Sequence, residues 1–156
     1  MTQIEQFFNA IRSNNNKEVV ALIKENPHLV NSQDNRGFTP LIFASYFDNE
    51  NAVKLLLESH AHIEARDSTG NTALIGVCFK GNTAIANLLL EHGANINAKN
   101  NLGTTPLIFA TMYNQYDIIK TLLEKDVDKS LKDNEGKTAR DYALEKGIER
   151  IIQLLD

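Results

Sequence analysis

Apolar residues recur along the chain in short groups that have the spacing of a helix face. Three groups show this spacing clearly: Val53, Leu56 and Leu57, then Ile85, Leu88 and Leu89, then Ile118, Ile119, Leu122 and Leu123. The stretches between the groups are rich in glycine, asparagine and aspartate, which is typical of turns. The pattern predicts many short helices joined by turns.

The groups belong to a repeat with a period of 33 residues. A glycine returns at this interval, and a threonine follows each glycine by two positions. The glycines are Gly37, Gly70, Gly103 and Gly136, and the threonines are Thr39, Thr72, Thr105 and Thr138. A period of this length indicates stacked units, each of which buries its apolar face against its neighbours.

Each unit contains start and stop signals for two helices. The segment from Asp34 to Gly37 predicts a turn whose glycine has a positive φ, and the next threonine predicts a helix cap followed by proline or alanine. Equivalent turns begin at Asp67, Asn100 and Asp133. Residues that tolerate the left-handed conformation are expected to end the first helix, near Asn15, Asp48, Gly81, Asn114 and Gly147. A second helix follows and closes, in the clearest copy, at His92 and Gly93.

This order of turn, short helix, second helix and turn resembles the ankyrin repeat, whose signature is the same period with a Thr-Pro-Leu-His-x-Ala core. The resemblance implies one domain: an all-α ankyrin-repeat solenoid whose helix pairs are joined by β-hairpin-like turns. Its full repeats are residues 34–66, 67–99 and 100–132, with a degenerate N-terminal cap repeat at 1–33 and a shortened C-terminal cap repeat at 133–156. The histidine of the signature is replaced by Ile42, Ile75 and Ile108, so apolar contacts are expected in place of its hydrogen bonds.

The first unit lacks the Thr-Pro opening but is expected to keep the register. Phe8, Ile11, Asn15, Val20 and Ile23 lie 33 residues before Leu41, Ala44, Asp48, Val53 and Leu56. Thr2 and Glu5 have the spacing of a capping box for its first helix. Departures from the pattern are expected here because a terminal repeat has a neighbour on one side only.

Composition narrows the classes of function. The chain has 16 basic and 20 acidic residues, and neither half is basic, which argues against a nucleic-acid binder held by phosphate contacts. No apolar stretch approaches the roughly 18 residues of a membrane helix, and the first residues do not have the pattern of a secretory signal. The single cysteine, Cys78, fits a reducing compartment. These features predict a cytoplasmic protein.

The resemblance implies a non-enzymatic module that binds a protein or an extended peptide on its concave face. Aromatic, methionine and basic side chains, which are common in binding hot spots, gather at the end of the first helices and beside the turns. The candidate partner-binding residues are Arg36, Phe38, Tyr46, Phe47, Arg66, Phe79, Lys80, Leu102, Met112 and Tyr113. The alternative interpretation is that the aromatic rings pack between repeats or against the turns. A stoichiometric inhibitor of one enzyme is the alternative function, and a homodimer through the same side chains is the alternative to a monomer.

Residues for other chemistry are sparse. There is no glycine-rich phosphate loop, and Cys78 stands at an expected core position with no histidine placed to activate it. His60, His62, Glu64 and His92 could supply metal ligands on an extended turn, but the favoured interpretation is that they are solvated turn residues. We therefore expect no cofactor, no metal and no catalytic residues. Asn97 resembles the asparagine that is hydroxylated in some eukaryotic ankyrin repeats.

Overall fold

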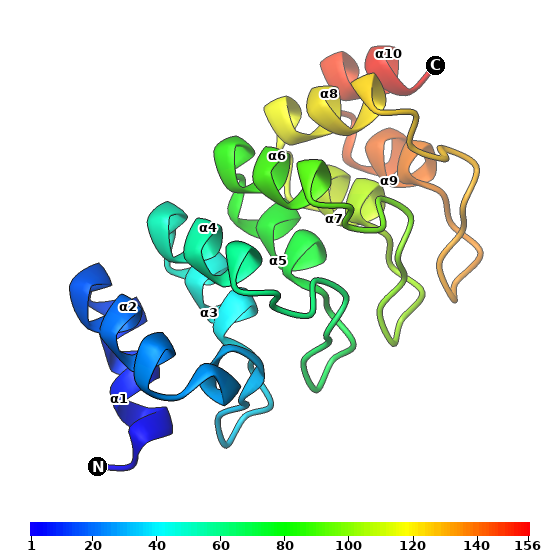
Figure 1. Ribbon diagram of the computed structural model, residues 1–156. Coiled ribbons are helices and arrows are strands. Elements are labelled where there is room, and N and C mark those ends of the chain that lie inside the picture. The colour runs from blue at the N-terminus through cyan, green and yellow to red at the C-terminus, as the bar shows by residue number, and fades with distance from the viewer.

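The computed structural model describes residues 1–156 and shows a row of helix pairs that runs from one terminus to the other (Figure 1). It contains ten α-helices, one 3₁₀ helix and no strands, which confirms the all-α prediction. The helices are α1 (Gln3–Arg12), α2 (Asn16–Glu25), η1 (Pro27–Asn31), α3 (Pro40–Tyr46), α4 (Glu50–Glu58), α5 (Ala73–Lys80), α6 (Thr83–Glu91), α7 (Pro106–Met112), α8 (Tyr116–Glu124), α9 (Ala139–Lys146) and α10 (Glu149–Leu155).

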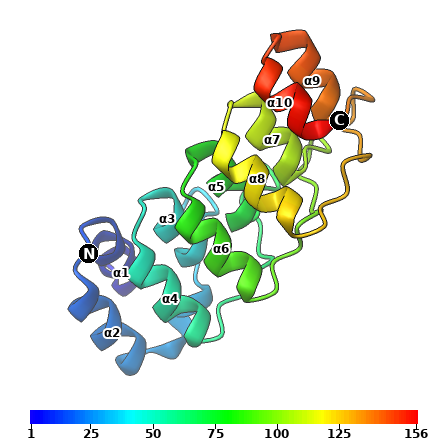
Figure 2. The same cartoon turned by 90° about the horizontal axis from the view of Figure 1, so that it is seen from above.

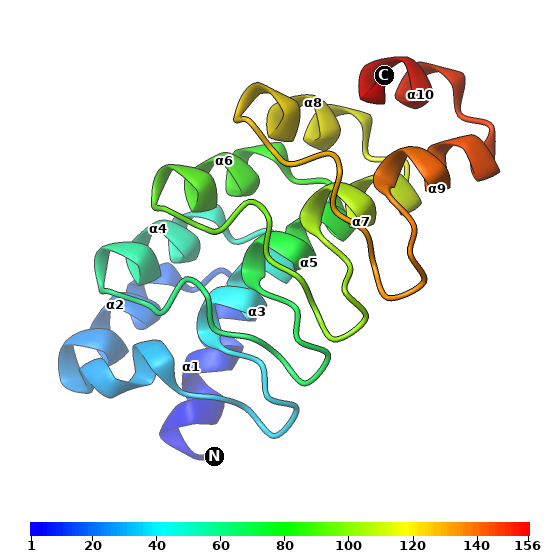
Figure 3. The same cartoon turned by 90° about the vertical axis from the view of Figure 1, so that its right-hand side faces the viewer.

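The helices form two layers. Helices α1, α3, α5, α7 and α9 pack successively against one another, and α2, α4, α6 and α8 form the second layer, with α10 at its end (Figure 2). Four hairpin loops project side by side from the layer of first helices (Figure 3). We call the surface made by the first helices and these hairpins the first-helix face; it corresponds to the concave face expected from the sequence.

Local chemistry forms each hairpin as predicted. The carboxylate of Asp34 accepts hydrogen bonds from the backbone N–H groups of Arg36 and Phe38 at 2.9 and 3.0 Å, and Gly37 adopts a φ of 82°. Asp67, Asn100 and Asp133 make the same pair of bonds in their own turns. Thr39, Thr72, Thr105 and Thr138 cap the helices that follow. The turn and capping predictions are therefore confirmed.

The first unit corrects the predicted register. Asp48, Gly81, Asn114 and Gly147 have the left-handed conformation as expected, but in the first unit this residue is Asn14, with Asn15 acting as the cap of α2. Val19 and Leu22 are buried in the core, whereas Val20 and Ile23 are only half-buried. Helix α2 has ten residues where α4 has nine. Because of this extra residue, the start of the first unit lies 34 residues before its equivalent in the second unit instead of the predicted 33. The capping box of Thr2 and Glu5 is present as predicted.

The core runs continuously between the two layers. One cluster of 34 buried residues extends from Phe7 to Leu155. Ile42, Ile75 and Ile108 are all buried, so apolar contacts do occupy the position of the missing histidine. Cys78 is also buried, and desolvation raises the pKa of its thiol, so its predicted place in the core is confirmed.

Polar side chains link successive units. Asn49 is buried; its side-chain amide donates to the Ile11 carbonyl at 2.9 Å, and its amide oxygen caps α4. Asn97 accepts a hydrogen bond from the backbone N–H of Asp128 at 3.0 Å, and Glu64 does the same for Asn95 at 2.7 Å. Asn97 is therefore a structural acceptor between units, whereas its modification stays a prediction.

Three of the four hairpins are joined by hydrogen bonds. The backbone N–H of Asn101 donates to the Thr69 carbonyl at 3.1 Å, and that of Asn134 donates to the Leu102 carbonyl at 3.0 Å. The side-chain amide of each asparagine adds a bond to a carbonyl of the preceding hairpin. No backbone hydrogen bond joins the first hairpin, residues 34–38, to the second. The junction between the second and third units is thus held less tightly at its hairpins.

The last hairpin carries a side-chain network of its own. The hydroxyl of Tyr142 donates to the carboxylate of Asp133, and the ammonium of Lys137 lies 2.9 Å from the carboxylate of Glu145. Desolvation by partial burial raises the pKa of Asp133. The hydrogen bonds from Tyr142 and from two backbone N–H groups, together with the charge of Lys137, lower it by more, so the net pKa is below the usual value of an aspartate. The folded chain therefore favours the ionised form of Asp133.

Candidate functional site

Large aromatic side chains are exposed on the first-helix face at the ends of α3, α5 and α7. Tyr46 is 52% exposed, Tyr113 45%, Phe79 40% and Phe47 36%. The left-handed residue that closes each of these helices turns the chain away, which leaves the preceding side chains at the edge of the layer. Large apolar groups exposed together in this way mark interaction surfaces.

The rings form two clusters. In the first cluster, Phe43 lies 5.0 Å from Phe8 and 4.7 Å from Phe47 between ring centroids, and Tyr46 lies 5.2 Å from Phe47. In the second cluster, Phe79, Phe109 and Tyr113 lie 4.6 to 6.3 Å apart. The aromatic rings thus contact one another, as the packing interpretation expects, and are exposed as well.

Three members of the clusters, Phe8, Phe43 and Phe109, are not among the binding residues predicted from the sequence, and Phe43 and Phe109 share a signal that could have found them. They belong to one column of the repeat, which reads Phe43, Gly76, Phe109 and Tyr142. This column was the available signal, because a glycine stands in the third unit where the second, fourth and fifth units have a ring. The glycine separates the two clusters along the face.

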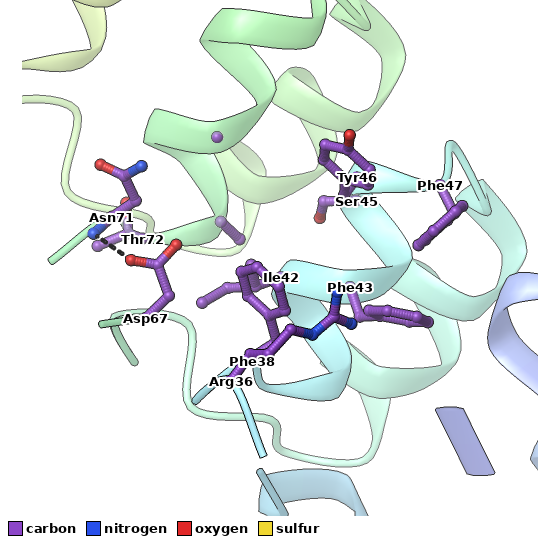
Figure 4. A pocket seen from close by; sticks show the side chains of 12 residues that line it. Arg36, Phe38, Ile42, Phe43, Ser45, Tyr46, Phe47, Asp67, Asn71 and Thr72 are labelled. Carbon is purple, nitrogen blue, oxygen red and sulfur yellow. Dashed lines mark hydrogen bonds between the residues drawn. The ribbon is translucent and has the colours of Figure 1, made fainter. Parts of the chain in front are cut away.

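A pocket with a volume of about 290 Å³ lies where this ring is missing (Figure 4). It opens between α3 with its hairpin on one side and α5 on the other. Its lining residues are Arg36, Phe38, Ile42, Phe43, Ser45, Tyr46, Phe47, Asp67, Asn71, Thr72, Ala73 and Gly76. This volume is close to the lower end of the range for small-molecule pockets, which is roughly 300 Å³. It suits a subsite for a single side chain.

Two cations flank the first cluster. The guanidinium of Arg36 lies 4.8 Å from the ring of Phe38 and 6.0 Å from that of Phe43, and its Nη2 atom is 3.1 Å from the carboxylate of Asp34. The ammonium of Lys80 lies 4.9 Å from the ring of Tyr46. These contacts hold both cations beside the aromatic rings.

The remaining candidate residues are placed differently. Arg66 donates to the carbonyls of Gly70 and Lys99, so its guanidinium ties two units together. Leu102 is 70% exposed at the tip of its hairpin, while Met112 and Phe38 are half-buried against the core. The structure therefore gathers Arg36, Phe38, Tyr46 and Phe47 around the pocket and engages Arg66 elsewhere.

The side chains considered for other chemistry have local roles. His60 is the left-handed residue that closes α4, and a ring nitrogen of His92 lies 2.8 Å from the carbonyl of Leu88. The structure contains no group of three or more histidine, cysteine, aspartate or glutamate residues arranged to hold a metal ion. None of its helices has the length and apolar character needed to cross a membrane.

Comparison with protein families identifies the repeat. A model for three copies of the ankyrin repeat matches residues 7–100, and a model for ankyrin repeats in many copies matches residues 79–143. A comparison with curated proteins gives no match. Ankyrin repeats are general modules of protein–protein interaction and are typically non-enzymatic. The matches cover most of the sequence, and the chain belongs to the ankyrin repeat family.

Proposed function

We propose that this protein binds a protein partner or an extended peptide along its first-helix face and has no catalytic activity of its own. The contacts are assigned to Tyr46, Phe47, Phe79, Met112 and Tyr113, with Arg36, Lys80 and the hairpin residues Phe38, Arg66 and Leu102 at the border. The observation that carries the proposal is the exposure of two aromatic clusters on one face of a stacked repeat protein.

Physical chemistry supports this choice of face. Burying aromatic surface yields about 25 cal/mol for each Å² of apolar area removed from water, and rigid rings lose little conformational entropy when they are bound. The rings already contact one another, so their orientations are fixed before a partner arrives. Preorganised apolar groups of this kind supply most of the binding energy in protein interfaces.

The test is affinity capture from a lysate of the source cells with the wild-type protein and with the combined variant Tyr46→Ala, Phe79→Ala and Tyr113→Ala. The three side chains are 40 to 52% exposed, so the variant should fold, which circular dichroism checks. Tyr116→Ala, at the start of α8, is the control for loss of a tyrosine from the second layer; its ring packs partly against the core, so circular dichroism checks the fold of this variant as well. A partner that binds the wild type and the control but not the triple variant supports the face.

Retention of the same partners by the triple variant would contradict the proposal. The monomeric state is tested by light scattering on the same proteins, and a dimer that the triple variant abolishes would assign the face to self-association. If the captured partner is an enzyme, a fall in its activity at one equivalent of this protein would identify the interaction as inhibitory.

A further inference from the structure

Gly76 creates an opening that the fold itself does not require. It lies in the interior of α5 without a positive φ, and a Cβ atom added there would meet no other atom within 4 Å. Glycine is unfavourable inside a helix, and the equivalent positions of the second and fourth units hold Phe43 and Phe109. The glycine therefore leaves room for a ring that this chain does not supply.

The walls of the pocket favour an apolar occupant. Phe38, Phe43, Tyr46 and Phe47 line the pocket from α3 and its hairpin (Figure 4), and Gly76 lines it from α5. Every buried side-chain nitrogen and oxygen of the protein already has a hydrogen-bond partner. A polar group entering the pocket would find no unpaired partner among the buried atoms of its walls, whereas an aromatic or large aliphatic side chain would gain ring contacts.

The border of the pocket favours a neighbouring negative charge. Arg36 directs its Nε and Nη2 atoms to the same carboxylate oxygen of Asp34, which leaves Nη1 without an acceptor in the chain. The adjoining hollow shares Arg36 and Phe43 and reaches Arg12, whose guanidinium hydrogen-bonds to Asn9 only. Donors for an incoming carboxylate are therefore present on the hairpin side.

The carboxylates nearby make hydrogen bonds of their own, but Oδ2 of Asp67 accepts none, because all three bonds to this carboxylate go to its Oδ1 atom. Asp34 and Asp67 accept backbone N–H groups of their own turns, and Glu5 accepts the backbone N–H of Thr2. Asp48 accepts from the side chain of Asn82 and lies 3.9 Å from the ammonium of Lys80. An incoming cation would meet the open Oδ2 of Asp67, whereas an incoming carboxylate would meet Nη1 of Arg36 and the guanidinium of Arg12 on the hairpin side.

We infer that the pocket over Gly76 receives one aromatic or large aliphatic side chain from an acidic segment of the partner protein, with a carboxylate of that segment bound by Arg36. The inference rests on the proposed function and names the chemistry that the face recognises. Gly76 and Arg36 are then the residues that decide which segment fits, and the exposed rings around them add affinity.

Nuclear magnetic resonance titration tests the pocket with two probes that share an indole ring. Indole-3-propionate carries a carboxylate and tryptamine carries an ammonium group, and ligands of this size are expected to bind with a Kd on the order of 1 mM. In ¹⁵N-labelled wild-type protein, indole-3-propionate should shift the amide signals of Gly76 and its neighbours in a saturable way. Its affinity should exceed that of tryptamine by about threefold or more, and Arg36→Gln should reduce the difference.

Gly76→Phe is the decisive variant, because it places in α5 the residue that α3 and α7 already carry at the equivalent position. It should abolish the shifts, while Gly76→Ala, which adds one methyl group, should retain them. Absence of saturable shifts in the wild type, equal binding of tryptamine, or unchanged binding to Gly76→Phe would each overturn the inference. The comparison of the two probes on the wild type does not depend on the folding of any variant.

The partner found by affinity capture separates this inference from the proposed function. Loss of that partner from the triple alanine variant and also from Gly76→Phe supports both. Loss from the triple variant with retention by Gly76→Phe leaves the binding face in place and refutes the pocket. Retention by both variants refutes the face and, with it, the assignment of the pocket to a partner.

Discussion

Gly70 and Gly136 occupy the same position of the hairpin turn but have different surroundings, which makes them a matched pair. Their φ angles are 81° and 77°. A Cβ atom at Gly70 would lie 2.8 Å from the backbone nitrogen and 2.9 Å from Cγ of Asn101, whereas a Cβ atom at Gly136 would meet nothing within 4 Å. The difference arises because another hairpin stacks on the turn of Gly70 and none follows that of Gly136.

We therefore expect Gly70→Ala to destabilise the protein more than Gly136→Ala. The left-handed conformation costs an alanine about 1–2 kcal/mol, and this cost is common to both variants. Gly70→Ala also displaces Asn101, which donates to the carbonyls of Thr69 and Ser68 at 3.1 and 3.2 Å. Each hydrogen bond is worth about 0.5–1.5 kcal/mol, so the variant should lose about 2–5 kcal/mol in total.

Urea unfolding monitored by circular dichroism measures both free energies, with the slope of each transition checking that unfolding remains cooperative. Amide hydrogen exchange locates the effect, because Asn101 should lose protection in Gly70→Ala and keep it in Gly136→Ala. Equal destabilisation by the two substitutions would show that the backbone conformation alone sets the cost, and would refute the role assigned to the contact between hairpins.

Three further substitutions test other parts of the structure. Asn49→Ala removes a helix cap and a buried hydrogen bond to the preceding unit, so urea unfolding should show a loss of about 2–4 kcal/mol in the free energy of unfolding. The control is Asn82→Ala, which should lose about 1 kcal/mol, because Asn82 caps α6 but the only other hydrogen bond of its side chain goes to the exposed carboxylate of Asp48. Asp133→Asn keeps the turn acceptor that Asn100 provides in the preceding unit. Because the pKa of Asp133 is lowered in the folded chain, the wild type should be the more stable at pH 7, and unfolding at several pH values should show this advantage disappearing as the pH falls below about 4. Gly76→Ala should stabilise the protein by up to about 1 kcal/mol in thermal unfolding, since the added methyl group meets no other atom.

The repeat could be predicted from sequence because its signals are local. A glycine with positive φ, a threonine cap and a left-handed residue each act within a few residues, and the period makes them visible. The first unit has neither the glycine nor the threonine, so its register had to be judged from apolar residues. These occur as adjacent pairs, Phe7 with Phe8 and Val19 with Val20, and either member of a pair could be aligned with the next unit.

The candidate site was less accessible to sequence reasoning. The exposed residues at the ends of the first helices follow from their position in the unit, but the engagement of Arg66 depends on a carbonyl one unit away. Gly76 gave no turn signal, because it lies inside a helix where glycine has no conformational task. Its meaning comes from Phe43 and Phe109, and their rings could be placed beside the exposed aromatic residues only in three dimensions.

The pocket and the weakest hairpin contact occur at the same junction, between the second and third units. A Cβ atom on Gly37 would lie 3.6 Å from the backbone nitrogen of Ser68, whereas the equivalent distances at Gly70 and Gly103 are 2.8 and 2.9 Å. The wider spacing accompanies the absence of a backbone hydrogen bond between these hairpins. A side chain that enters over Gly76 therefore breaks no backbone hydrogen bond between hairpins when it gains its contacts with the rings.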